Sequence, residues 1–225
     1  MIKYAAALLV ALMYVVSVLR QAQDGPELSR RAGHDVPSEF DILFSTNCAG
    51  CHGSDGKGGA ARGLADPLFL RIADDATLQR VTADGVPGTA MPAFAQAAGG
   101  SLTDEQLSAL VRGMRANWTA ASDARDATPP PYSSSTAGDP NRGGDAFATF
   151  CSRCHGVDGR GGPRGSSIVD SSYLSLVSDQ NLRTTIIAGR PDLGAPDWRG
   201  NLPGRPMSPD DVSDVVAWLA AKRQP

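Results

Sequence analysis

The chain begins with one continuous apolar stretch, and the rest alternates apolar and polar positions at helical spacing. Residues 1–19 contain a single charge, Lys3, and Arg20 ends the run. A helix of that length is roughly 28 Å long, close to the hydrocarbon thickness of a bilayer, about 30 Å. No small-x-small cleavage site follows, because cutting after Ala22 would place Arg20 three positions back. The pattern predicts an uncleaved transmembrane anchor over residues 1–20, with a cleaved signal peptide as the alternative.

After a polar tether at 21–37, two stretches share a helical pattern. Helices are expected near 38–47 and 74–83 in the first, and near 142–151 and 179–188 in the second. Each stretch closes with an amphipathic helix whose apolar face can be read directly: Leu107, Leu110, Val111 and Met114 in one, Val212, Val215, Val216 and Leu219 in the other. No convincing alternating strand pattern appears. We therefore predict an all-α fold with long loops.

Both closing helices carry capping signals at their starts. Thr103 with Gln106 predicts a capping box, and Ser208 followed by Pro209 predicts an N-cap with proline in the first turn. Leu102 and Met207 directly precede these caps. There each would form a hydrophobic staple with its helix.

The two stretches are copies of one another. The segment from Phe44 to Gly59 matches the segment from Phe147 to Gly162 at a constant offset. Residues 119–141 between the copies are rich in Pro and Ser, which is typical of a semi-rigid linker. The chain is thus predicted to hold a first domain at 38–118 and a second at 142–225.

Each copy contains a Cys-x-x-Cys-His sequence, namely Cys48, Cys51 and His52, and Cys151, Cys154 and His155. At this spacing two thiols can add to the two vinyl groups on one edge of a porphyrin, and the adjacent histidine can ligate the iron. These motifs use every cysteine of the chain. A thioredoxin-like dithiol would need a βαβ context, and a Cys₄ zinc site a much shorter gap between the pairs. We predict two covalently attached haem c groups.

With these motifs the chain resembles the cytochrome c family in its di-haem, tandem-domain form, over about residues 38–118 and 142–225. The resemblance implies two small helical domains that shuttle single electrons. It carries over the four cysteines as thioether anchors and His52 and His155 as proximal iron ligands. Members of the family usually complete the iron with a methionine on the opposite side.

The sixth ligand expected in the first domain is Met91. It lies in the segment Gly85-Val-Pro-Gly-Thr-Ala-Met-Pro-Ala-Phe94, which resembles the distal methionine loop of the family. A loop methionine followed by proline can present its thioether from a fixed backbone, and such ligation raises the reduction potential. The alternative is a methionine that fills a gap in the core, which is the role expected of Met114.

The second domain departs from this pattern. Aligning Gly189 with Gly85 sets Ala195 opposite Met91, and alanine cannot ligate iron. Met207, the only methionine of this half, is a tentative ligand that the long preceding segment could bring over the haem. Two alternatives stay open: an iron that is open or water-bound, and ligation by His34 of the tether.

The functional expectation combines the anchor with the resemblance. The chain would be a single-pass protein of the bacterial inner membrane, with its haem domains on the periplasmic side, transferring electrons without catalytic residues of its own. Its partners would be redox proteins such as a quinol-oxidising complex, a terminal oxidase, a dehydrogenase or a photosynthetic centre. The alternative is a di-haem oxidoreductase, or its cytochrome subunit, with a substrate-accessible second haem. The net charge of −3 gives no electrostatic case for nucleic acid.

Overall fold

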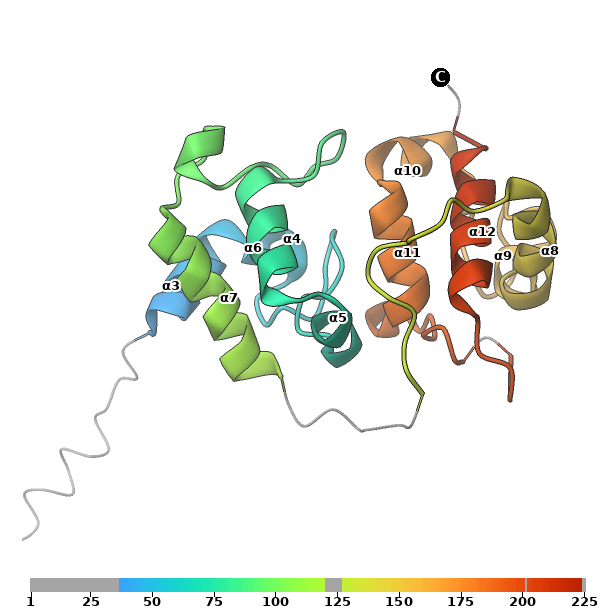
Figure 1. Ribbon diagram of the computed structural model, residues 1–225, viewed down its shortest axis with the longest axis horizontal. Helices are drawn as coiled ribbons and strands as arrows, with labels where there is room; N and C mark the ends of the chain where they lie inside the picture. Colours follow the sequence, from blue (N-terminus) through green and yellow to red (C-terminus); the bar gives the residue numbers. More distant parts are fainter. Residues whose placement is uncertain (1–36, 120–126, 201, 224–225) are drawn as a thin grey trace, which may run out of the picture. The chain divides into compact units, whose positions relative to one another are not determined.

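A computed structural model describes residues 37–119, 127–200 and 202–223 (Figure 1). The predicted anchor at 1–20 and nearly all of the predicted tether lie outside these residues. None of the helices in the described ranges has the length and apolar character needed to cross a bilayer. The compact unit Glu39–Pro225 contains two sets of helices, called here the first repeat (α3 to α7) and the second repeat (α8 to α12).

The two repeats have the same order of elements. The first contains α3 (Glu39–Asn47), α4 (Ala49–His52), α5 (Pro67–Ile72), α6 (Asp75–Asp84), the 3₁₀ turn η1 (Gln96–Ala98) and α7 (Asp104–Trp118). The second contains α8 (Pro140–Phe150), α9 (Ser152–His155), α10 (Ser171–Leu176), α11 (Asp179–Ala188), the 3₁₀ turn η2 (Pro191–Leu193) and α12 (Pro209–Ala220). The described residues form isolated β-bridges but no longer strand. The predicted all-α class is confirmed, while the short α5 and α10 were not anticipated.

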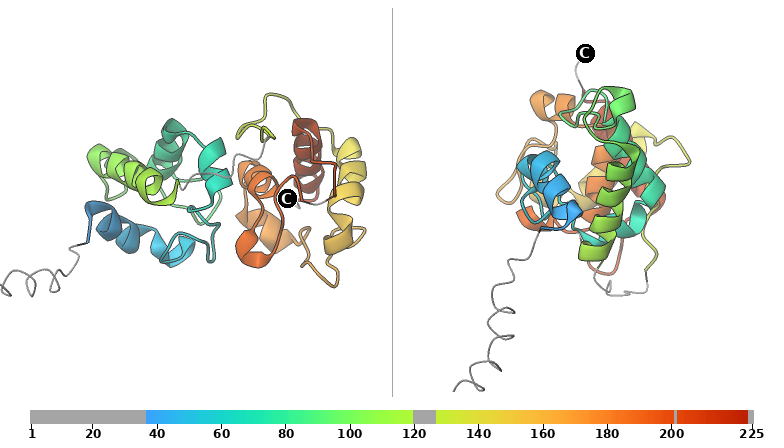
Figure 2. Two further views of the ribbon diagram at one scale, coloured as in Figure 1. Left: turned by 90° about the horizontal axis from the view of Figure 1, so that it is seen from below. Right: turned by 90° about the vertical axis from the view of Figure 1, so that its left-hand side faces the viewer.

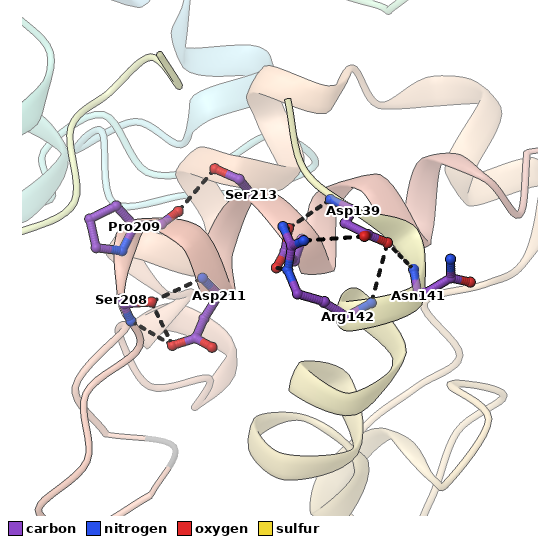
Figure 3. A network of polar contacts seen from close by, with 8 residues as sticks. Asp139, Asn141, Arg142, Ser208, Pro209, Asp211 and Ser213 are labelled. Carbon is purple, nitrogen blue, oxygen red and sulfur yellow. Dashed lines mark hydrogen bonds and ion pairs between the residues drawn. The ribbon is translucent and has the colours of Figure 1, made fainter. Parts of the chain in front are cut away.

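Side chains fix where most of these helices start. The predicted capping box of α7 is present: Thr103 Oγ1 accepts from the Gln106 N–H, and the Gln106 side chain accepts from the Thr103 N–H at 3.0 Å. Ser208 and Asp211 form the corresponding box on α12, as Figure 3 shows. Each capping box gives acceptors to two backbone N–H groups that the start of a helix would otherwise leave without partners.

In the first repeat, α7 packs against α3 and α6. Phe40 and Phe44 of α3 meet the Trp118 ring edge-on, with centroids 5.3 and 5.0 Å away. The close approach of α3 and α7 depends on Gly113, because a Cβ there would lie 2.2 Å from the Phe40 ring. The closely packed glycine of this repeat thus comes from its last helix.

In the second repeat, α12 lies along α8 (Figures 1 and 2). Trp218 of α12 stacks on Phe147 of α8 at 4.3 Å, and the closely packed glycine, Gly143, is here on the first helix, α8. A Cβ at Gly143 would lie 2.0 Å from the carbonyl oxygen of Asp214. The buried Asp214 carboxylate accepts from Arg142 Nε at 2.8 Å and from the Asp139 N–H at 2.7 Å, which ties α12 to the start of α8.

One arginine in each repeat attaches the short middle helix to the closing helix. Arg115 donates to the carbonyls of Leu70 and Ala73 at the end of α5, and pairs with Asp75 at 2.7 Å. Arg223 makes the same set of contacts in the second repeat: it donates to Leu174 O at 3.0 Å and Val177 O at 2.8 Å, and pairs with Asp179. Arg115 lies inside α7, whereas Arg223 follows the end of α12. The same contacts are therefore made from positions that do not correspond in sequence.

Candidate haem sites

A single helical turn carries each Cys-x-x-Cys-His sequence. Cys48 precedes α4 and His52 ends it, with the His52 N–H donating to Cys48 O at 3.0 Å. Cys151 and His155 bracket α9 in the same way, also with a bond of 3.0 Å. The cysteines are free thiols rather than disulfides. The turn therefore places two thiols and one imidazole together in each repeat, in the arrangement that covalent haem attachment requires.

The imidazoles are oriented by backbone carbonyls. His52 Nδ1 donates to Arg62 O at 2.8 Å, and His155 Nδ1 donates to Ser166 O at 2.8 Å. Occupying Nδ1 in this way fixes the tautomer and leaves Nε2 available to a metal. Burial also lowers the pKa of His52, which favours the neutral ring that ligates iron.

The first thiol of each motif is held in its neutral form. Burial, with a smaller contribution from Cys51, raises the pKa of Cys48 to about 11. Burial and Cys154 raise the pKa of Cys151 to about 12. Across the described residues, His, Cys, Asp and Glu side chains form no group of three or more that could hold a metal ion.

Buried donors without acceptors indicate where an acidic group would bind. In the described residues, Arg62 Nε and Nη1 and Trp198 Nε1 are buried and have no hydrogen-bond partner. Arg62 lies 4.5 Å above the centroid of the Phe69 ring, and burial lowers its pKa to about 10. A buried cation without an acceptor is costly, and a haem propionate is an acceptor of the right charge. The residues of both repeats therefore fit a haem. The sequence alone offered no signal for Arg62 or Trp198, since neither belongs to a motif.

The Met91 loop connects α6 to η1. It opens at Gly85, whose φ of 68° and contact with the backbone of Pro92 both require glycine. The Val86 N–H then donates to Met91 O at 3.0 Å, and the Met91 N–H donates to Thr89 Oγ1 at 3.2 Å. Met91 is partly exposed at the end of this closed turn. Its backbone is thus fixed while its side chain remains available.

The second repeat builds the same loop around a different side chain. It opens at Gly189, with φ of 73°, and the Arg190 N–H donates to Ala195 O at 3.1 Å. Ala195 therefore occupies the position of Met91. Met207 lies elsewhere, 1 % exposed in the hydrophobic core directly before α12. His34 is outside the described residues.

Comparison with known proteins agrees with this geometry. The family model for cytochrome c oxidase, cbb3-type, subunit III matches residues 37–112, and the model for cytochrome c matches residues 140–222. The chain contains two cytochrome c-type domains in tandem. Its two Cys-x-x-Cys-His motifs are accordingly sites for two covalently attached haem c groups.

Curated relatives extend across both domains. The cytochrome bc1 complex cytochrome c subunit of Mycobacterium bovis is 25% identical over 178 residues, which cover 79% of this chain and 60% of that protein. The subunit of the same name from Mycobacterium leprae is 26% identical over 189 residues, covering 81% of this chain and 61% of that protein. The chain thus spans about 60% of the length of these relatives.

Among solved structures, a chain from the reducing HAO-like protein complex of Kuenenia stuttgartiensis aligns with this protein. The alignment covers 84% of this chain and 98% of that chain. The TM-score is 0.44 and the sequence identity 18%. A likeness at this level carries no functional conclusion.

Proposed function

We propose that this protein is a membrane-anchored di-haem cytochrome c that serves as an electron-transfer subunit of a respiratory complex. The observation that carries the proposal is the duplicated turn in which two cysteines precede a histidine whose Nδ1 is held by a backbone carbonyl. The named function of the mycobacterial relatives, a cytochrome c subunit of the bc1 complex, supports the choice of complex. A quinol-oxidising complex is therefore the preferred partner over a dehydrogenase or a photosynthetic centre.

The chain's residues have separate tasks in this proposal. A bound haem would accept and release one electron at its iron. The four cysteines prevent loss of the group, and His52 and His155 present Nε2 to the metal. Met91 would offer its thioether to the iron of the first domain, which would favour the ferrous state. Arg62 and Trp198 would donate to haem carboxylates, which would give partners to their buried N–H donors.

The anchor and the side of the membrane form a separate part of the proposal. Residues 1–20 would hold the chain in the inner membrane, with both haem domains in the periplasm. The apolar run of the sequence supports the anchor. It would keep the haem domains close to integral membrane partners.

Haem content and reducibility test the electron-transfer assignment. The full chain, produced with a cytochrome c maturation system, should gain the mass of two haems and undergo two reversible one-electron reductions. The Cys48→Ser/Cys51→Ser variant should lose one haem and one reduction step, and Cys151→Ser/Cys154→Ser should lose the other. A mature chain with fewer than two haems would contradict the proposal.

Membrane attachment and partner choice need their own measurement. The full chain should stay with membranes after a high-salt wash, whereas a chain lacking residues 1–20 but given a cleavable leader should be soluble. Quinol added to membranes should reduce both haems, and an inhibitor of the quinol-oxidising complex should stop this reduction. Reduction that is insensitive to the inhibitor would point to a different donor.

A further inference from the structure

We propose that the second domain gives its iron no thioether ligand, so that the second haem has an exchangeable distal position that binds a small exogenous ligand. The chemical class is that of water on ferric iron and of π-acceptor diatomic molecules such as carbon monoxide on ferrous iron. The inference rests on the proposed di-haem assignment and concerns Ala195 and Met207.

The first step is the correspondence of the two distal loops. Each opens at a positive-φ glycine, Gly85 or Gly189, that touches the backbone further along its loop. Each is closed by an N–H from the residue after that glycine: Val86 donates to Met91 O at 3.0 Å, and Arg190 donates to Ala195 O at 3.1 Å. Since the opening glycine and the closing hydrogen bond match, Ala195 stands where the first domain has its methionine.

The second step is the position of Met207. In the first domain the Phe94 N–H donates to Ala83 O, and the Leu102 N–H donates to Phe94 O at 2.8 Å. In the second, the Trp198 N–H donates to Ile187 O, and the Met207 N–H donates to Trp198 O at 2.9 Å. Trp198 is therefore the counterpart of Phe94, and Met207 is the counterpart of Leu102.

The burial of these two side chains supports the same conclusion. Leu102 is 4 % exposed and Met207 1 % exposed, each directly before the N-cap of the closing helix, Thr103 or Ser208. Leu102 is a core side chain that has no affinity for iron. Met207 fills the same core position, which explains its presence without a role at the metal.

The remaining side chains of the loop offer no strong replacement ligand. The second half of the sequence contains no other methionine, and its one histidine is His155 of the motif. The carboxylates of the loop are engaged by neighbouring arginines: Asp192 pairs with Arg190 at 2.7 Å, and Asp197 pairs with Arg199 at 2.5 Å. An iron held by His155 is thereby left to exogenous ligands on its other side.

Carbon monoxide binding to the dithionite-reduced full chain tests the inference. We expect one carbon monoxide to bind per chain. The visible spectrum should change for the second haem and stay unchanged for the first. Met207→Leu, which installs the side chain type found at position 102, should leave this stoichiometry and both haem spectra unchanged. His34→Ala should also leave them unchanged.

Ala195→Met provides a gain-of-function test. Ala195 is partly exposed, so its loop has room for a longer side chain. The variant should lose carbon monoxide binding, and its oxidised spectrum should show the sulfur-to-iron charge-transfer band of Met91 at doubled intensity. Ala195→Leu is the matched control, since it adds bulk without a thioether and should give no added band.

The outcomes separate this inference from the proposed function. If the chain carries two reducible haems and neither binds carbon monoxide, the inference is wrong while the electron-transfer function stands. The inference is equally wrong if Met207→Leu or His34→Ala creates a new carbon monoxide site or removes a thioether band. If the second haem is absent, the proposed function itself fails.

Discussion

The two domains share one loop design but place different side chains in it. The loops that begin at Gly85 and Gly189 share one closing hydrogen bond, yet one carries Met91 and the other Ala195 at the bonded carbonyl. The loop is therefore maintained by glycine conformation and backbone bonding, whichever side chain it carries. Under the proposals above, a single side chain of this loop would decide whether the iron of a domain has a thioether ligand.

A second difference lies where the first and last helices of each domain cross. Gly113 of α7 lies against the Phe40 ring of α3, whereas Gly143 of α8 lies against the Asp214 backbone of α12. Each crossing thus contains a closely packed glycine, on the last helix in the first domain and on the first helix in the second. The packed volume at the crossing is thus a property of the pair, which no single sequence position reveals.

The largest effect is expected from making the first domain resemble the second. Met91→Ala should remove the thioether from the first iron and lower its potential by on the order of 0.1 V, within the roughly 0.8 V that axial ligands span. Carbon monoxide should then bind at both haems. Spectroelectrochemical titration measures both effects. Met114→Leu is the control, because Met114 lies in the core 4 % exposed and should leave the potentials unchanged.

The next effect concerns the crossing of α8 and α12. Gly143→Ala should destabilise the second domain by about 3 kcal/mol, because the added Cβ meets the backbone at Asp214 O. Gly113→Ala should cost less, about 1–2 kcal/mol, because its Cβ meets the Phe40 ring, which can move. Guanidinium unfolding of the holoprotein measures both.

Gly144→Ala is the matched control for this pair. Its Cβ would come no closer than 3.4 Å, to Trp218 Nε1, so the gain in helix propensity should stabilise α8 by about 0.5–1 kcal/mol. If Gly143→Ala and Gly144→Ala had equal effects, the close crossing at Gly143 would be wrong.

A smaller effect should follow from removing the arginines that hold α5 and α10. Arg115→Gln and Arg223→Gln should each cost about 2 kcal/mol, since each leaves carbonyls at a helix end without their charged donor. Thermal unfolding of the two variants compares them directly. Arg160→Gln should change stability by less than about 0.5 kcal/mol, because the ion pair of Arg160 with Asp158 is exposed. A negligible effect of Arg223→Gln would show that its contacts do not substitute for those of Arg115.

The smallest effect concerns the stability of the second domain in acid, which depends on the carboxylate of Asp214. Burial raises the pKa of Asp214. Hydrogen bonds from Arg142 and from the Asp139 N–H together lower it by more, so the pKa lies below the ordinary value. The stabilisation is therefore present above the ordinary carboxyl pKa of about 4 and is lost as the pH falls through the folded value. Asp214→Asn should cost about 1 kcal/mol at pH 7, discounted for the exposure of Arg142, and should flatten the acid side of the stability profile.

Unfolding free energies measured between about pH 2 and 7 check this prediction. An unaltered slope of stability against pH for Asp214→Asn would contradict the role given to its carboxylate.

Local chemistry made much of this molecule predictable from sequence. The turn around Cys48 and His52, the Thr103 cap and the equivalence of Ala195 to Met91 each depend on a few neighbouring residues. The contacts of Arg115 and Arg223 were not predictable, because they join segments more than forty residues apart. Met207 shows the limit most clearly: the sequence suggested both a hydrophobic staple and a tentative ligand. Its burial and the hydrogen bond from its N–H to Trp198 O agree with the staple position.

The buried guanidinium of Arg62 has a consequence for how the protein is made. Without porphyrin, the first domain must enclose a cation whose Nε and Nη1 have no acceptor, at its own energetic expense. We therefore expect the newly made polypeptide to stay loosely folded until its cofactor arrives. Such a delay would keep both thiols within reach of the ligation machinery and make closure of the domain the last event of biogenesis.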